Sequence, residues 1–117
     1  MNYTKKSYYI FVLSSLTAFL FSCNEPKTGK ESTFYVRGNC GMCKERIENS
    51  LKTTDGIVKA DWDVKTKNLT VTYDSTKIGE DKIQQLVANS GHETKTKTSP
   101  QAVHDALPEC CKKSGTM

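Results

Sequence analysis

The alternation of two hydrophobic periods along residues 33–98 limits the possible folds more than any other feature of this chain. Four segments show the every-second-residue pattern or composition of a strand, and two show apolar residues at helical spacing. The predicted strands are 33–36, 57–64, 69–73 and 92–98, and the predicted helices are 43–53 and 80–89. The order strand-helix-strand-strand-helix-strand is typical of the ferredoxin-like α+β fold, an antiparallel sheet with two helices on one face.

Two of the predicted strands carry further expectations. The second strand is expected to place one set of apolar residues on the buried face of the sheet: Val58, Ala60, Trp62 and Val64. The last strand alternates threonines with lysines, which favours an exposed sheet edge. Gly91 stands between the second helix and this strand, where a glycine cap is expected.

The residues with the most distinctive chemistry form a C-x-x-C motif, Cys40-Gly41-Met42-Cys43, just before the first predicted helix. This spacing brings two sulfurs together when the first cysteine lies on a loop and the second opens a helix. The positive end of the helix dipole favours the thiolate form of Cys43. Thiolates select Cu(I), and also Zn(II), Cd(II) and Hg(II), over hard ions. Because two sulfurs suit an ion of low coordination number, the motif predicts a soft-metal site with Cu(I) as the foremost ion.

A thiol-disulfide redox protein is the alternative function for the same motif. A thioredoxin-type site would need a proline facing the cysteines, and Pro26, Pro100 and Pro108 all lie outside the predicted domain. A third interpretation is an interaction domain that has kept the fold without the chemistry. The sequence shows no catalytic triad, paired catalytic carboxylates or phosphate-binding loop, so we do not expect an enzyme.

A second pair of thiols, Cys110 and Cys111, lies in the C-terminal tail after a possible helical turn at 102–107 that ends at Pro108. Three interpretations remain open. The pair can fold back to complete a site with Cys40 and Cys43, capture metal independently, or form an oxidised vicinal pair. His104, in the same tail, is expected to be a surface side chain.

With these features the chain resembles the heavy-metal-associated domain, which copper chaperones, the metal-binding parts of copper pumps and periplasmic mercury-binding proteins share. The resemblance covers residues 33–97 and rests on the C-x-x-C loop, the apolar helix positions, Gly56-Ile57, the strand 69–73 and Ser90-Gly91-His92. It implies that Cys40 and Cys43 carry the ion and that the loop with His92 approaches it. His92 is then either a third ligand or a solvated side chain.

The motif loop departs from the pattern of that family, which is Gly-Met-x-Cys-x-x-Cys. Gly38-Asn39-Cys40 is one residue shorter and lacks the methionine that packs under the site in the family. Met42 lies between the two cysteines instead. It is interpreted as an apolar cover of the loop, with a thioether ligand as the alternative.

The N-terminal segment resembles a bacterial lipoprotein signal. Lys5 and Lys6 precede an apolar run, 8–21, that is shorter than the roughly 20 residues of a membrane-spanning helix. The run ends in Leu20-Phe21-Ser22-Cys23, which is similar to a lipobox. The resemblance implies cleavage before Cys23 and a lipid on its thiol. An ordinary cleaved signal and a short anchor helix are the alternatives.

These patterns predict four parts: a signal peptide at 1–22, a tether at 23–32, a metal-binding domain at 33–98 and a cysteine-containing tail at 99–117. The mature protein is expected to be exported and held by its lipid on a membrane of the cell envelope, facing the periplasm or the cell surface. The net charge is only +4, with no basic cluster, so we do not expect a nucleic-acid partner. Expected partners are a metal ion and a cysteine-bearing transporter or cuproprotein.

Overall fold

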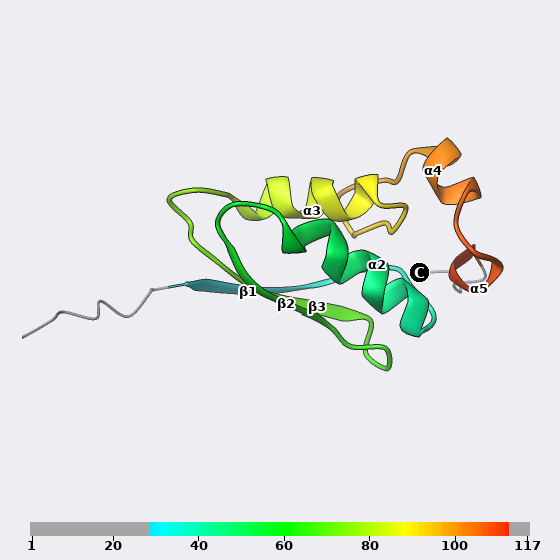
Figure 1. The fold of residues 1–117 in the computed structure, drawn as a ribbon, viewed down its shortest axis with the longest axis horizontal. Coiled ribbons are helices and arrows are strands. Elements are labelled where there is room, and N and C mark those ends of the chain that lie inside the picture. Colours follow the sequence, from blue (N-terminus) through cyan, green and yellow to red (C-terminus); the bar gives the residue numbers. More distant parts are fainter. Residues whose placement is uncertain (1–28, 113–117) are drawn as a thin grey trace, which may run out of the picture.

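The computed structural model describes residues 29–112 and shows a three-stranded antiparallel sheet covered by helices. The elements in chain order are β1 (Lys30–Tyr35), α2 (Gly41–Lys52), β2 (Ile57–Trp62), β3 (Asn68–Tyr73), α3 (Glu80–Asn89), α4 (Gln101–Asp105) and α5 (Glu109–Lys112). The strands lie in the order β1-β3-β2, and α2 and α3 cover the same face of the sheet (Figure 1). This is the predicted ferredoxin-like α+β arrangement.

The core lies between the two long helices and the sheet. Helix α2 buries the predicted stripe of Cys43, Ile47 and Leu51, and α3 buries Ile83 and Val87. The sheet contributes a matching set of buried side chains: Trp62, Leu69, Val71 and Tyr73. The helical spacing identified these buried residues, because residues four apart share one side of a helix. Leu86, which was predicted in the same stripe of α3, is only partly buried.

Two elements begin earlier than the sequence predicts. Strand β1 begins at Lys30, inside the predicted tether, because residues 30–32 pair with Val71, Thr72 and Tyr73 of β3. Helix α2 begins at Gly41, two residues before the predicted start. Cys40 is thus the residue that immediately precedes the helix.

The predicted buried face of β2 is wrong at Val58 and Val64, which are 56% and 36% exposed. A β-bulge is the reason at Val58, whereas Val64 lies in the turn beyond the end of β2 at Trp62. Ile57 pairs with Tyr73 and Lys59 with the adjacent Thr72, so Val58 is an extra residue that shifts the alternation. Ile57 therefore joins the face that turns towards α2.

The predicted fourth strand, 92–98, is also wrong, since it is reduced to a single bridge between Val36 and Thr94. The threonine hydroxyls bind elsewhere. Those of Thr94 and Thr96 donate to Oε1 of Gln84 in α3, at 2.8 and 2.5 Å. The Thr94 hydroxyl also accepts from the backbone amide of Lys97, 3.0 Å away, which closes a turn. Hydroxyl groups that bind backbone and helix in this way compete with a strand ladder.

The C-terminal segment 100–112, which we call the strap, folds back over the domain. Its helices α4 and α5 lie at the end of the molecule where α2 begins (Figure 1), and α5 contacts α2. Leu107, between them, is only 4% exposed and packs against Gly91. Gly91 has φ +100°, and a Cβ there would lie 2.9 Å from the Leu107 side chain. Only glycine suits both requirements.

The predicted signal peptide, Cys23 and most of the tether lie outside the described residues. Within residues 29–112, no helix is both long and apolar enough to span a lipid bilayer.

Candidate metal centre

The two cysteines of the C-x-x-C motif converge at the start of α2. Their Sγ atoms are 3.5 Å apart. The carbonyl of Cys40 accepts hydrogen bonds from the amides of Cys43 and Lys44, at 3.0 and 3.1 Å, and these bonds form the first turn of the helix. Cys43 is fully buried on the core side of α2, whereas Cys40 is only partly buried. One sulfur therefore lies in the core and the other towards the surface.

The strap brings Cys110 and Cys111 to the same place. The Sγ of Cys110 lies 2.9 Å from that of Cys40, and the Sγ of Cys111 lies 2.6 Å from that of Cys43. Cys111 is also 4.0 Å from Cys40 and 3.9 Å from Cys110. Of the three interpretations of the tail, the geometry matches the one in which it folds back onto the motif.

The four sulfurs occupy a volume that suits one ion. Zinc-thiolate bonds of about 2.3 Å in a tetrahedron place neighbouring sulfurs about 3.8 Å apart. Of the five Sγ–Sγ separations given above, three are close to that value, at 3.5, 3.9 and 4.0 Å, and the other two are shorter, at 2.9 and 2.6 Å. All four cysteines are free thiols. The arrangement can therefore offer up to four sulfur ligands.

His92 adds a nitrogen to this cluster. It is 1% exposed, so the solvated alternative for this residue is wrong. Its Nδ1 lies 3.0 Å from the carbonyl oxygen of Arg37, to which it donates. Its Nε2 is buried and has no hydrogen-bond partner among the described residues. Ligand atoms of Cys43, His92 and Cys111 all lie within 4.8 Å of one another.

The sulfurs differ in acidity because their surroundings differ. The hydrogen bond with the thiol of Cys110 lowers the pKa of Cys40 to about 7. The same contact, followed by burial, raises the pKa of Cys110. Burial is also the main cause that raises the pKa of Cys111, followed by its hydrogen bond with Cys43. Cys40 is thus a thiolate at neutral pH in a large part of the molecules.

The geometry of this cysteine cluster agrees with the comparison to known proteins. Residues 33–93 match the heavy-metal-associated domain. The chain belongs to that family. Proteins similar to it include the copper chaperone CopZ of Staphylococcus aureus (strain JH9), which is 27% identical over 55 residues. The aligned segment covers 47% of this chain and 81% of CopZ.

Two further relatives broaden the comparison. The zinc-transporting ATPase of Synechocystis sp. is 41% identical over 54 residues, which are 46% of this chain but only 8% of the ATPase. Among solved structures, the CopZ metallochaperone superposes with a TM-score of 0.54 at 26% identity, over 56% of this chain and 98% of the other. The likeness is thus to a whole small chaperone and to one small part of a large transporter.

Trp62 lies beneath the motif loop, where the heavy-metal-associated pattern has its methionine. A Cβ on Gly38 would lie 2.7 Å from the indole ring and 3.2 Å from the Cβ of Cys43, so the ring fills the space under the loop. The indole Nε1 donates to the carbonyl oxygen of Val36, 3.1 Å away. The sequence identified Trp62 only as a core residue. The missing methionine was the one signal that another side chain had to support the loop.

Met42 and His104 lie at the edge of the cluster. Met42 is 50% exposed, and its Sδ lies 3.8 Å from the Sγ of Cys110. His104 is half-buried in α4, with Nδ1 3.3 Å from the carbonyl oxygen of Gly91. It therefore fastens the strap and is not the surface side chain that the sequence predicts.

Two residues that hold the strap in place were missed at the sequence level. Leu107 packs on Gly91, and the side-chain amide of Asn39 donates to the carbonyl oxygen of Cys110 at 3.3 Å. The sequence signal for both was weak: a single leucine in a largely polar tail, and one asparagine beside a cysteine.

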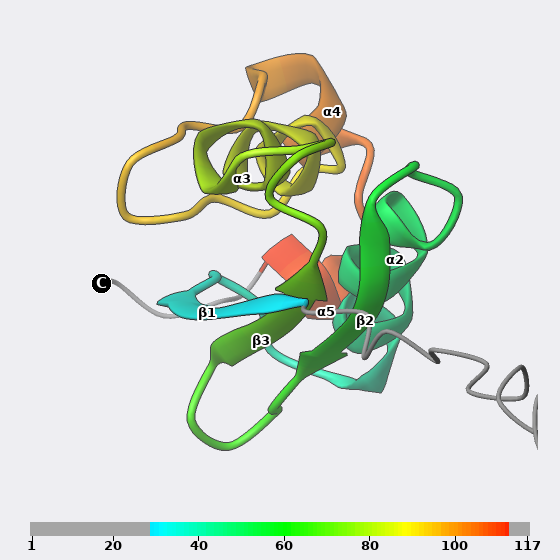
Figure 2. The same cartoon turned by 90° about the vertical axis from the view of Figure 1, so that its left-hand side faces the viewer.

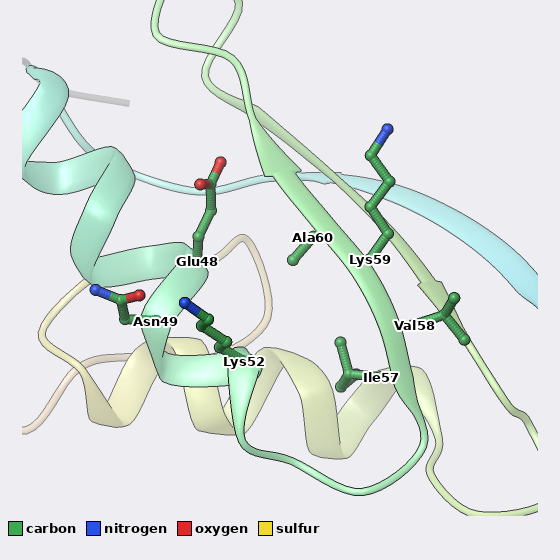
Figure 3. Close-up of a pocket in the computed structure, with 7 residues that line it drawn as sticks. All are labelled: Glu48, Asn49, Lys52, Ile57, Val58, Lys59 and Ala60. Carbon is green, nitrogen blue, oxygen red and sulfur yellow. The ribbon is translucent and has the colours of Figure 1, made fainter.

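A separate pocket of about 310 Å³ lies between α2 and β2. Figure 3 shows Ile57 and Ala60 of β2 pointing towards α2, while Val58 and Lys59 point away. Its lining contains neither cysteine nor histidine, and the Glu48 carboxylate at its rim is already bound by the amide of Trp62 at 2.9 Å. The pocket contains no metal ligand set, so it is separate from the cysteine cluster.

Proposed function

We propose that the protein binds a soft, thiophilic metal ion, Cu(I) foremost, through Cys40 and Cys43, for sequestration or handover at the cell envelope. The observation that carries this proposal is the 3.5 Å separation of the two Sγ atoms at the first turn of α2. Two thiolates at this distance can ligate one ion, and soft sulfur ligands favour Cu(I) over hard cations.

The choice of Cu(I) rests on the chemistry of the pair and on the relatives. Two sulfurs from one loop suit an ion of low coordination number, and CopZ, a copper chaperone, aligns over 81% of its length. The zinc-transporting ATPase makes Zn(II) the main competitor. Cd(II) and Hg(II) are also thiophilic ions that a pair of thiolates can bind.

Handover would proceed by ligand exchange, in which a thiolate of the partner attacks the bound ion while one sulfur of this protein leaves. Cys40 is suited to be the exchanging ligand because it is only partly buried and its pKa is about 7. The partner would be a cysteine-bearing metal transporter or cuproprotein. This function is binding and transfer, without catalysis.

The cellular placement follows from the N-terminal sequence alone. We propose that the segment ending at Ser22 directs export and that Cys23 carries a lipid. The protein would then be anchored to a membrane of the cell envelope and would face the periplasm or the cell surface. Both features lie outside the described residues.

Competition with a chromogenic Cu(I) chelator under reducing conditions tests the metal function. The samples are the full chain in mild detergent, Cys40→Ser and Cys43→Ser, with Cys23→Ser as the control for a cysteine substitution outside the proposed site. Loss of a direct ligand should weaken Cu(I) binding by more than about 100-fold, since even outer-shell changes cost 10 to 100-fold. Unchanged affinity in both motif variants would refute the proposal, and no tight binding in any sample would favour the redox alternative.

A further inference from the structure

The strap places its two cysteines at the motif through contacts of its own. Leu107 packs on Gly91, and Asn39 donates to the carbonyl oxygen of Cys110 at 3.3 Å. Helix α5 lies beside α2 (Figure 2). Its two thiols contact those of Cys40 and Cys43, and Cys111 is 1% exposed. A cysteine buried in this way is held in position by packing as well as by its thiol contacts.

The sulfurs of the strap and those of the motif lie in direct contact with one another. Each motif sulfur has its nearest sulfur neighbour on the strap, at 2.9 Å for Cys40 and at 2.6 Å for Cys43. The separations within each pair are longer, at 3.5 and 3.9 Å. The four thiols therefore form one cluster.

His92 provides an independent sign of a ligand at this place. Its Nδ1 is committed to the Arg37 carbonyl, so its Nε2 carries a lone pair. That atom is buried beside Cys43 and Cys111 with no hydrogen-bond partner among the described residues. Buried polar atoms are normally paired, and an unpaired imidazole nitrogen beside thiols has the chemistry of a metal ligand.

We propose that Cys110 and Cys111 are metal ligands that close the site over Cys40 and Cys43, with His92 Nε2 adjoining them. The ion is then held by three or four sulfurs and leaves only when the strap is displaced. This inference rests on the proposed function, because it concerns the same ion. No oxidation is involved, because each thiol that binds the ion loses only its proton, which passes to water.

Closure changes what the site can do. A two-sulfur site on an exposed loop exchanges its ion readily with another pair of thiols. A site that also contains ligands from a docked strap must open before a partner's thiolate can reach the ion. It also accepts ions that prefer four thiolates in a tetrahedron, such as Zn(II) or Cd(II). The strap would therefore control both retention and the range of ions bound.

Two measurements on the reduced full chain test this proposal. X-ray absorption of the Cu(I)-loaded protein counts the sulfurs around the ion, and Co(II) loading reports a tetrahedral thiolate site through its visible absorption. The variants are Cys110→Ser/Cys111→Ser and Cys40→Ser/Cys43→Ser, with Cys23→Ser as the control. Far-UV circular dichroism checks that each variant is folded, and the single variant Cys110→Ser, at a half-buried position, serves if the double variant is not.

The expected result is three or more sulfurs around Cu(I) in the parent and control, and two in Cys110→Ser/Cys111→Ser. The tetrahedral Co(II) spectrum should be lost in that variant, and release of Cu(I) to a chelator should become at least tenfold faster. An unchanged sulfur count and release rate would overturn the proposed closure while leaving Cys40 and Cys43 as the site. Retained Cu(I) binding in Cys40→Ser/Cys43→Ser would overturn the proposed function itself.

The variant Leu107→Ala separates strap docking from ligation, because it keeps all four cysteines. Release of Cu(I) should be faster than in the parent even though no ligand has been removed. A release rate equal to that of the parent would contradict the claim that the ion leaves by displacement of the strap.

Discussion

Cys40 and Cys43 have the same side chain but different surroundings. Cys43 is fully buried on the core side of α2, while Cys40 precedes the helix, is partly buried and contacts the thiol of Cys110. The sulfur of Cys43 is suited to hold an ion in place, and the sulfur of Cys40 is suited to exchange it.

The pKa of Cys40 leads to a prediction about thiol reactivity in the reduced, metal-free protein. The pKa of this thiol is lowered to about 7, so its thiolate should appear as pH rises through about 7. Site-resolved alkylation by iodoacetamide, read by mass spectrometry, should reach half its maximal rate at Cys40 near pH 7. Cys111, whose pKa is raised, should remain unreactive over the same range.

The matched variant is Cys110→Ala, which removes the hydrogen bond that lowers the pKa of Cys40. Its alkylation midpoint at Cys40 should move to higher pH. An unmoved midpoint would show that the contact between the two thiols does not control Cys40.

The role of a residue could be predicted from the sequence where it follows from a local motif. It could not be predicted where it depends on packing between distant segments. The spacing of Cys40 and Cys43 identified the pair directly. The environment of His92 could not be predicted, because it is formed by the Arg37 carbonyl and by Cys111 of the strap, which are distant in the sequence. The contact between Trp62 and Gly38 joins residues on different elements, so no local pattern could reveal it.

At the level of elements, the contact of Leu107 with Gly91 is one of the contacts that dock the strap. Leu107→Ala should lower the free energy of unfolding by about 2 kcal/mol or more, the usual cost of removing a buried leucine side chain. Val103→Ala, at a position in α4 that is 36% exposed, is the matched control and should change it far less. Urea denaturation of both variants measures the difference, and equal effects would argue against docking through Leu107.

The segment after α3 is held by hydroxyl groups instead of a strand ladder. Thr94→Val keeps the shape of the side chain but removes the bond to Gln84 and the acceptor for the Lys97 amide. Stability should fall by about 1 to 3 kcal/mol, the cost of leaving buried polar partners unpaired. Thermal denaturation compared with Thr98→Val, an exposed position, measures this loss. A gain in stability on Thr94→Val would favour the strand that the sequence predicts.

These elements show where sequence periodicity fails. The stripe of Cys43, Ile47 and Leu51 was correct, because burial at four-residue spacing is a strong signal in a helix. The alternating threonines of 94–98 gave the strand pattern, but the hydroxyls of Thr94 and Thr96 bind Gln84 of α3. The bulge at Val58 shifts the alternation without any change in composition.

On the scale of the whole molecule, the order of the elements from β1 to α3 was predictable, because strands and helices have different hydrophobic periods. The return of the strap to α2 was not, since two short helices and one leucine leave little pattern in the sequence. The docked strap extends the described fold beyond the 33–93 match to the family.

Membrane attachment is the prediction at this scale. Cys23→Ser should remove the lipid attachment point, so the protein should move from the membrane fraction to the soluble fraction after cell lysis. Ser22→Ala, which keeps a small residue before the cysteine, is the matched control and should remain with membranes. Membrane fractionation of Cys23→Ser with an uncut N-terminus would instead favour an anchor helix.

Protection of individual thiols by Cu(I) identifies the cysteines that hold the ion. The reduced full chain is loaded with one equivalent of Cu(I), alkylated, and mapped by mass spectrometry cysteine by cysteine, with the metal-free protein as the reference. We predict that Cys40 and Cys43 are alkylated more slowly in the loaded protein than in the metal-free protein. Bound Cu(I) with Cys40 and Cys43 still fully open to alkylation would contradict the account, because the ion would then be held elsewhere.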